Sequence, residues 1–151
     1  MQNPEEDLRA FVGPNADYYL QAWAAADPNG GRQALRWNWP AFFLNVIWML
    51  YRKMYLQAAV TFVIFCMPGV NIILHILVGA FANYLYYKHA KAKILETRPH
   101  LSEQALYPAL KVIGGVHSWA ITVGIVFGVV LVVTLAFFFA AISTFMLGMM
   151  H

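Results

Sequence analysis

The sequence predicts an all-α integral membrane protein with a short cytoplasmic N-terminal helix, an interfacial helix, a helical hairpin and a long C-terminal transmembrane helix. Hydrophobic residues make up 61% of the chain and charged residues only 11%, and the mean hydropathy is +0.57. These values are outside those of ordinary soluble domains. Residues 112–151 contain no Asp, Glu, Lys or Arg. Aromatic and basic residues flank the apolar runs, as they do at membrane interfaces.

The distribution of charge divides the chain into four segments. Residues 1–38 form a polar, acidic cytoplasmic segment, and residues 39–93 hold the interfacial helix and the hairpin. Residues 94–111 are a cytoplasmic linker, and residues 112–151 are the C-terminal transmembrane helix. Because the basic residues gather beside the membrane segments, they indicate orientation and contact with anionic lipid headgroups, and they do not suggest a nucleic-acid partner. The first residues lack the features of a cleavable signal peptide, so an internal span is expected to direct insertion.

The N-terminal segment is expected to contain one short helix. Pro14 begins it, and a turn over residues 27–31 ends it. Tyr19, Leu20 and Trp23 share one face of this helix and must cover something apolar. This face either binds a partner or the membrane surface, or packs on the interfacial helix that follows.

The interfacial helix is expected near residues 40–51. Pro40 suits the first turn of a helix, so the helix begins at Asn38 or Trp39. The apolar run over residues 41–50 is too short to span the hydrocarbon core, which needs roughly 20 residues. Its aromatic and basic residues are of the kind that anchor a helix at headgroup depth and meet anionic lipid: Trp37, Trp39, Trp48, Tyr51, Arg52 and Lys53.

A hairpin follows, with one helix over residues 54–67, a break at Pro68-Gly69, and a second helix over residues 70–87. A first arm of this length is short for a span, so the hairpin either crosses the membrane twice, which we favour, or is re-entrant. The last helix is expected over residues 116–146. With the basic clusters on the cytoplasmic side, the N-terminus is inside the cell and the C-terminus outside.

Three linked blocks carry a resemblance to a known family. They are Tyr18-Tyr19, the run Trp37-Asn38-Trp39-Pro40-Ala41-Phe42-Phe43, and the run Trp48-Met49-Leu50-Tyr51-Arg52-Lys53-Met54-Tyr55. Over about Tyr18 to Lys91, the chain resembles a bacterial family of small membrane proteins known as domain-of-unknown-function family 2628. The resemblance implies a bacterial inner-membrane location and no reaction. Where a Gly or Pro is expected in that family, midway through the first helix, this chain has Leu44-Asn45-Val46, so we expect an unbroken helix.

A polar and small stripe recurs every four residues in the second helix of the hairpin: Asn71, His75, Gly79 and Asn83. Such a stripe should not face lipid, because an unsatisfied polar group in hydrocarbon is costly. As a functional site, it would make His75 a proton-relay member or an axial ligand to a haem or chlorin. The alternative is hydrogen bonding between helices, which we favour because a relay usually brings intramembrane carboxylates.

The last helix carries Gly124 and Gly128, whose Gly-x-x-x-Gly spacing allows another helix to approach closely. The sequence contains no pattern typical of a catalytic or metal site. The hypothesis is therefore a non-catalytic accessory, scaffold or assembly subunit of a larger bacterial inner-membrane complex, whose partners are other membrane subunits or a second copy. The alternatives are a small oligomeric transporter or proton-linked protein that uses the His75 stripe, and a cofactor-ligating subunit.

Overall fold

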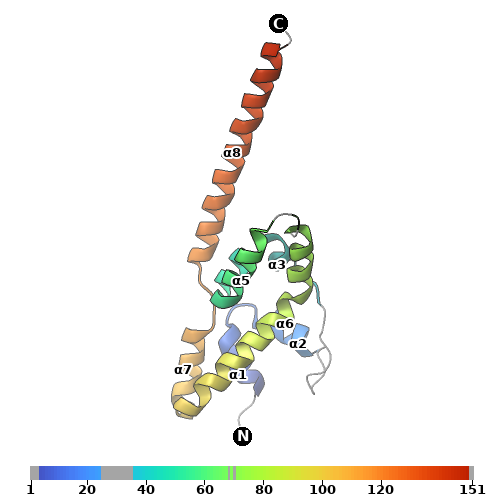
Figure 1. The fold of residues 1–151 in the computed structure, drawn as a ribbon. Helices are drawn as coiled ribbons and strands as arrows, with labels where there is room; N and C mark the ends of the chain where they lie inside the picture. Colours follow the sequence, from blue (N-terminus) through green and yellow to red (C-terminus); the bar gives the residue numbers. More distant parts are fainter. Residues whose placement is uncertain (1–3, 25–35, 68, 70, 150–151) are drawn as a thin grey trace.

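The computed structural model describes residues 4–24, 36–67, 69 and 71–149. Within these residues the chain is all-α, as predicted, with eight α-helices and one 3-10 turn (Figure 1). The elements are α1 (Pro4–Val12), α2 (Ala16–Ala24), α3 (Trp39–Leu44), α4 (Val46–Tyr51), α5 (Tyr55–Phe65), α6 (Asn71–Thr97), η1 (Arg98–His100), α7 (Glu103–Ile113) and α8 (Trp119–Met149). The predicted turn at residues 27–31 and Pro68 lie outside the described residues.

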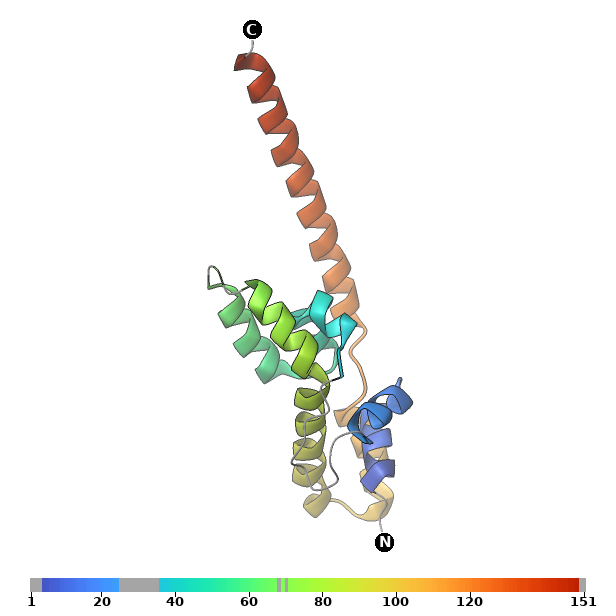
Figure 2. The same ribbon diagram turned by 90° about the vertical axis from the view of Figure 1, so that its right-hand side faces the viewer.

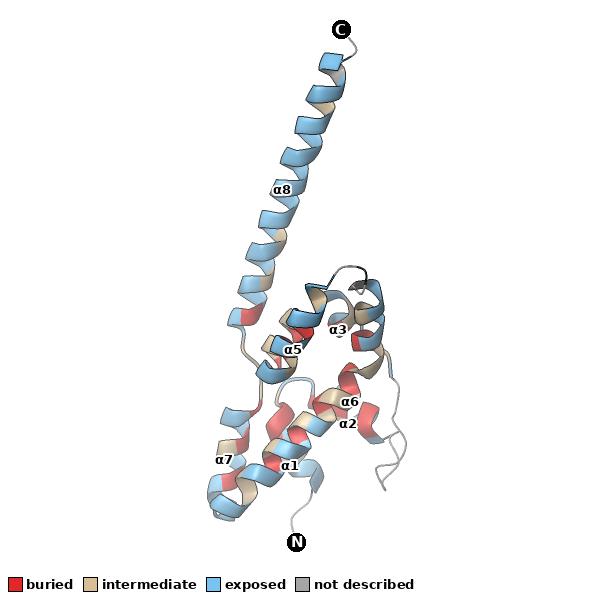
Figure 3. Ribbon diagram, in the orientation of Figure 1, coloured by how far each residue is buried: buried red, intermediate tan, exposed pale blue. Residues whose placement is uncertain are grey.

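The polar end of the molecule is a small helical head, formed by α1, α2, the second half of α6, and α7. Helix α1 packs against each of the other three, and the buried residues gather where these helices meet (Figure 3). Arg98 pairs with Asp7, which joins η1 to α1. The sequence predicted one short helix before residue 38, but the described residues contain two, because Ala10, Phe11 and Val12 supply α1 with its own buried face.

Helix α6 continues through the head, well beyond the end predicted at Tyr87. Its buried face follows a four-residue spacing through Ala82, Tyr86, Ala90 and Ile94. Residues at this spacing share one helix face, so packing against the head extends the helix through its basic segment to Thr97. The predicted linker over residues 94–111 likewise contains α7. That helix is amphipathic and buries Leu106 and Leu110.

The interfacial segment consists of two short helices, where the sequence predicted one. Helix α3 ends and α4 begins at Asn45, whose φ is 42° and ψ is −108°. A positive φ is uncommon for residues other than Gly, and Asn is among those that tolerate it best. The expectation of an unbroken helix through Leu44-Asn45-Val46 is therefore wrong. Asparagine makes the break at the position where we expected Gly or Pro in related sequences.

Helix α5 and the first half of α6 form the hairpin, and Gly69 lies between them with a φ of 86°. The 11 residues of α5 measure about 16 Å at 1.5 Å per residue, roughly half of a 30 Å hydrocarbon core. Many apolar side chains of this hairpin are exposed, among them Phe62, Val63, Ile72 and Ile73. The tip of the hairpin lies on the same side of the head as α8 in both ribbon views (Figures 1 and 2).

Helix α8 extends away from the rest of the molecule (Figure 2). The mean hydropathy of its segment Trp119–Met146 is 3.0 over the most apolar part, and none of that part is buried. Among the described residues, α8 is the one helix that is long and apolar enough to cross a membrane. At 1.5 Å per residue its 28 residues measure about 42 Å, more than a 30 Å core requires. The start of α8 packs on α4. Just before it, His117 donates its backbone N–H to the carbonyl of Tyr51 at 2.9 Å.

Candidate functional site

The guanidinium of Arg52 is enclosed where the end of α4 meets the head. Arg52 follows α4 directly and is only 3% exposed. The guanidinium carbon lies 4.5 Å from the ring centre of Tyr19, 5.2 Å from that of Tyr86 and 5.5 Å from that of Tyr51. These distances are within the range of favourable cation–π contacts, so three aromatic rings surround one cation. We call Arg52 with these three tyrosines the arginine cage.

Arg52 makes no ion pair with any carboxylate that the structure describes; the ion pairs there belong to Arg9, Lys93 and Arg98. Its Nη1 instead donates to the carbonyl oxygens of Val12 at 3.3 Å and Pro14 at 3.5 Å. Val12 ends α1, where the helix dipole is negative and favours a cation. The Arg52 Nε is buried without a hydrogen-bond partner among the described residues. Neutral carbonyls and rings thus offset this charge only in part.

This position corrects the expectation that Arg52 anchors the chain at the membrane surface. Trp48, another expected anchor, is also buried, with its ring centre 6.1 Å from that of Tyr86. Both side chains turn inward and contact the ring of Tyr86 in α6. Of the remaining expected anchors, Trp39 is 60% exposed, whereas Trp37, Tyr51 and Lys53 are half-buried.

Lys53 contacts the last turn of α7. Its Nζ donates to the carbonyl of Val112 at 2.8 Å, and burial lowers the pKa of its ammonium group. Its backbone has a φ of 59°, which allows the chain to turn sharply between α4 and α5. The adjacent residues Arg52 and Lys53 therefore contact the ends of α1 and α7, and neither acts as a simple surface charge.

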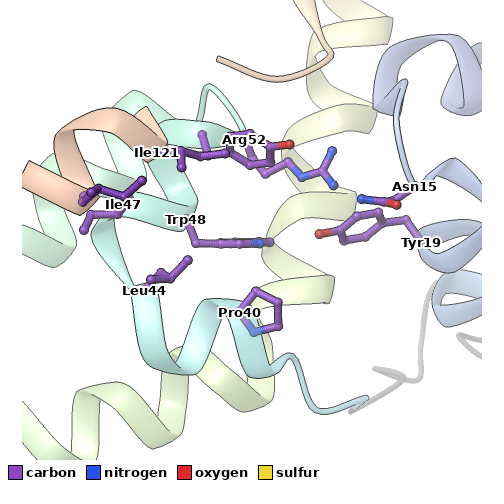
Figure 4. Close-up of a pocket in the computed structure, with 11 residues that line it drawn as sticks. Asn15, Tyr19, Pro40, Leu44, Ile47, Trp48, Arg52 and Ile121 are labelled. Carbon is purple, nitrogen blue, oxygen red and sulfur yellow. The ribbon is translucent and has the colours of Figure 1, made fainter. Parts of the chain in front are cut away.

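A cavity of about 380 Å³ opens beside the arginine cage, between α2, α3, α4 and the first turns of α8. Figure 4 shows the guanidinium of Arg52 directed toward Asn15 and Tyr19, with Leu44, Ile47 and Ile121 at the other end. The cavity is therefore polar at the head and apolar along α8. Its lining is Asn15, Tyr19, Pro40, Leu44, Ile47, Trp48, Tyr51, Arg52, Ile121, Gly124 and Ile125. A second hollow, of about 260 Å³, shares Asn15, Tyr19 and Pro40 with it.

The predicted polar stripe on α6 is brought against α3 and α2 in its second half. The side-chain amide of Asn38 donates to the Asn83 side-chain oxygen at 2.9 Å, and Asn83 Nδ2 donates to the carbonyl of Arg36 at 2.8 Å. Trp23 Nε1 donates to the carbonyl of Asn83 at 2.9 Å. At Gly79, an added Cβ would lie 2.9 Å from the Cβ of Phe42, so the small residue allows α3 to approach closely.

His75 lies among aromatic rings in the outer half of the same stripe. Its ring centre is 6.0 Å from that of Phe42 and 5.4 Å from that of Phe65, both in edge-on geometry. The side chain of Asn71 lies outside the described part of the structure. Among the described residues there is no group of three or more His, Cys, Asp or Glu side chains that could hold a metal ion.

The other two predicted contact surfaces are used, at least in part, within the chain. Tyr19 and Trp23 are buried against Tyr86 of α6, with ring centres 5.0 and 5.7 Å apart, and Leu20 packs beside them. This face therefore packs on α6, and Arg52 at the end of α4 also contacts its Tyr19 ring. On α8, a Cβ at Gly124 would lie 3.1 Å from Ile47 of α4, whereas Gly128 faces open space.

Sequence reasoning missed two residues of the site, Tyr86 and Asn38. Tyr86 is fully buried and contacts four aromatic rings, those of Phe11, Tyr19, Trp23 and Trp48. The four-residue spacing of Ala82, Tyr86 and Ala90 could have indicated a buried face, but the aromatic run before Lys88 suggested an interface belt. Asn38 could have been found as a helix N-cap two residues before Pro40 in the first turn.

Residues 10–74 match the family described as protein of unknown function (DUF2628), which confirms the family expected from the aromatic blocks. The matched region contains Tyr19, Tyr51 and Arg52 of the arginine cage, and it ends before Tyr86 and α8. The search of curated proteins and the search of solved structures found no match.

Proposed function

We propose that this chain, whose residues 10–74 form a DUF2628 family domain, is a non-catalytic accessory or scaffold subunit of a larger assembly in the bacterial inner membrane. Helix α8 would anchor the chain and contact membrane-embedded partners, while the head stays at the cytoplasmic surface. The N-terminus would be inside the cell and the C-terminus outside.

The observation that carries this proposal is the exposure of the apolar surface of α8 beyond its first turns. Side chains such as Val132, Phe138 and Phe145 are each more than half exposed, and the chain provides no second long apolar helix among its described residues to cover them. A bilayer would cover this surface, and a membrane-embedded partner would cover part of it, because helices in lipid associate through close packing.

The hairpin supports the same arrangement. Its exposed apolar side chains lie on the α8 side of the head, and its length suits re-entrant insertion better than two spans. The basic residues Lys88, Lys91 and Lys93 lie beyond it on the second half of α6, toward the head. An excess of Lys and Arg favours the cytoplasmic side, which supports a cytoplasmic head.

The contacts between α4 and α8 support a scaffold more than a simple anchor. Gly124 packs closely on Ile47, and His117 bonds to Tyr51, so the membrane helix is joined to the head beside the arginine cage. A partner bound to α8 would therefore be held at a defined place relative to the head. The proton-relay and cofactor alternatives gain no comparable support, because the rings of Phe42 and Phe65 flank His75.

In-membrane photo-crosslinking tests this proposal. A photo-reactive residue at position 138, on the exposed surface of α8, should give one defined crosslinked protein, whereas one at Tyr107, exposed on α7, should not give the same product. Replacing residues 126–146 by leucine keeps an apolar anchor but removes the specific surface, so the product should disappear while the chain stays in the membrane. A chain that is monomeric in mild detergent and gives no product from position 138 would contradict the proposal.

A further inference from the structure

The cavity beside the arginine cage has the chemistry of a binding site for an anionic amphiphile. Its polar end holds a buried guanidinium with no ion pair to a described carboxylate, and the two hydrogen bonds to carbonyls use one of its three nitrogens. The Nε lacks a partner among the described residues. A buried charge is costly unless it is paired, so an anion at this place would complete the site.

The polar end also lies at headgroup depth. The carbonyl of Tyr51, which precedes Arg52, accepts the backbone N–H of His117, two residues before α8 begins at Trp119. A bilayer that surrounds α8 therefore places its lipid headgroups near the level of Arg52. Lipid phosphates lie at this depth, and a guanidinium forms strong, charge-assisted hydrogen bonds with phosphate oxygens.

The apolar end leads from the cage along the first two turns of α8. Ile121, Gly124 and Ile125 line it from α8, and Leu44 and Ile47 line it from the interfacial helices. These walls run in the direction in which the acyl chain of a lipid points. The volume of about 380 Å³ lies within the range of about 300–1,000 Å³ that is typical of small-molecule sites.

We propose that this cavity binds one anionic phospholipid, with its phosphate on Arg52 and an acyl chain between α4 and α8. Asn15, which borders the cage and has a φ of 68°, lines the headgroup end. A bound lipid would connect α2, the interfacial helices and α8, which all line this cavity. This inference rests on the membrane insertion of α8 in the proposed function, but it does not depend on a partner protein.

Lipid binding can be measured on the full chain, purified in dodecyl maltoside and stripped of lipid, by native mass spectrometry. The probes are dioleoylphosphatidylglycerol, dioleoylphosphatidylcholine and inorganic phosphate. One phosphatidylglycerol should bind per chain, at a concentration about tenfold below that needed for phosphatidylcholine, because only the former carries a net negative charge. Equal binding of the two lipids, or displacement of phosphatidylglycerol by millimolar inorganic phosphate, would overturn the proposal.

Two variants locate the site. Arg52→Gln should abolish the preference for phosphatidylglycerol. Ile125→Trp fills the apolar end from an exposed position on α8, outside the cage, and should weaken binding about tenfold even if Arg52→Gln fails to fold. Ile142→Trp is the matched control, because it makes the same change on the same helix away from the cavity, and its binding should equal that of the wild type. Unchanged binding in Ile125→Trp would show that the lipid does not occupy this cavity.

These measurements use the isolated chain. A failure of lipid binding therefore leaves the scaffold proposal intact, and a failure of photo-crosslinking from α8 leaves the lipid proposal intact.

Discussion

The side-chain amides of Asn38 and Asn83 meet across 2.9 Å, and this buried hydrogen bond joins the start of α3 to the middle of α6. Asn38 at the same time caps α3 by accepting the N–H of Ala41 at 3.0 Å. Asn83 also donates to the carbonyl of Arg36. The two residues are 45 positions apart, so this pair connects the interfacial segment directly to the head.

Asn83→Ala should therefore destabilise the protein. It leaves the buried side-chain amide of Asn38 without its partner, and an unsatisfied buried group costs about 1–3 kcal/mol. Thermal unfolding in mild detergent measures the effect. Gln104→Ala removes an amide from an exposed position of α7 and should leave the Tm unchanged. Equal Tm values for the two variants would contradict a structural role for the Asn38–Asn83 bond.

Gly79→Ala should lower the Tm as well. The added Cβ would lie 2.9 Å from the Cβ of Phe42 and 3.0 Å from Cζ2 of Trp37, so α3 must move away from α6. Overpacking of this kind costs about 1–3 kcal/mol. Gly128→Ala makes the same change where nothing lies within 4 Å, and it should not lower the Tm. The comparison fails if both glycines accept alanine equally well.

The effect of substitutions at Asn45 on stability should depend on the positive φ of its backbone. Its φ is 42°, a backbone conformation that Gly adopts easily, and both polar atoms of its side chain are buried and unpaired among the described residues. Replacement by Gly should therefore be tolerated. Asn45→Gly should keep or raise the Tm, whereas Asn45→Val should lower the free energy of unfolding by about 1–3 kcal/mol. If Val is tolerated as well as Gly, the chain does not break between α3 and α4 in this way.

Lowering the pH should reduce the stability of the folded head through protonation of His89. Its ring is half-buried, 6.1 Å from that of Phe11, and burial, followed by the charge of Lys93, lowers the pKa of its imidazole. The unfolded chain then binds a proton more readily than the folded one, so stability is lost as the pH falls below about 6.5 toward the folded pKa. His89→Gln should reduce this loss of Tm between about pH 7.5 and 5.5. An identical pH profile in the variant would exclude His89 as a cause.

Orientation can be tested with one engineered cysteine. Cys66 is exposed, so it is first replaced by Ala, and Leu95→Cys then places a thiol at an exposed position on the second half of α6. A membrane-impermeant maleimide should label position 95 only after the membrane is opened. Gly148→Cys, near the end of α8, should be labelled in intact cells. Labelling of position 95 in intact cells would reverse the proposed topology.

Local sequence pattern determined the elements that depend on apolarity and spacing alone. The charge-free segment after Lys111 predicted a long apolar helix, and α8 is that helix. The Pro68-Gly69 pair predicted a break between two apolar helices, and α5 and α6 lie on either side of it. The aromatic blocks around Trp39 and Trp48 were specific enough to predict the family. A helix that spans a membrane can be predicted from local sequence because the hydrocarbon core of the bilayer favours an apolar residue at nearly every position.

Only the tertiary structure decided which polar and aromatic residues face inward. By composition, Arg52 beside Tyr51 is an interface anchor, yet its guanidinium is enclosed by the rings of Tyr19 in α2, Tyr51 in α4 and Tyr86 in α6. Helix α6 similarly continues past Tyr87 because α1 and α7 cover its basic half, and Asn45 breaks the interfacial helix so that α3 can reach Gly79 while α4 reaches Gly124. These outcomes depend on contacts between residues far apart in the chain, and the burial they create is absent from any local pattern of residues.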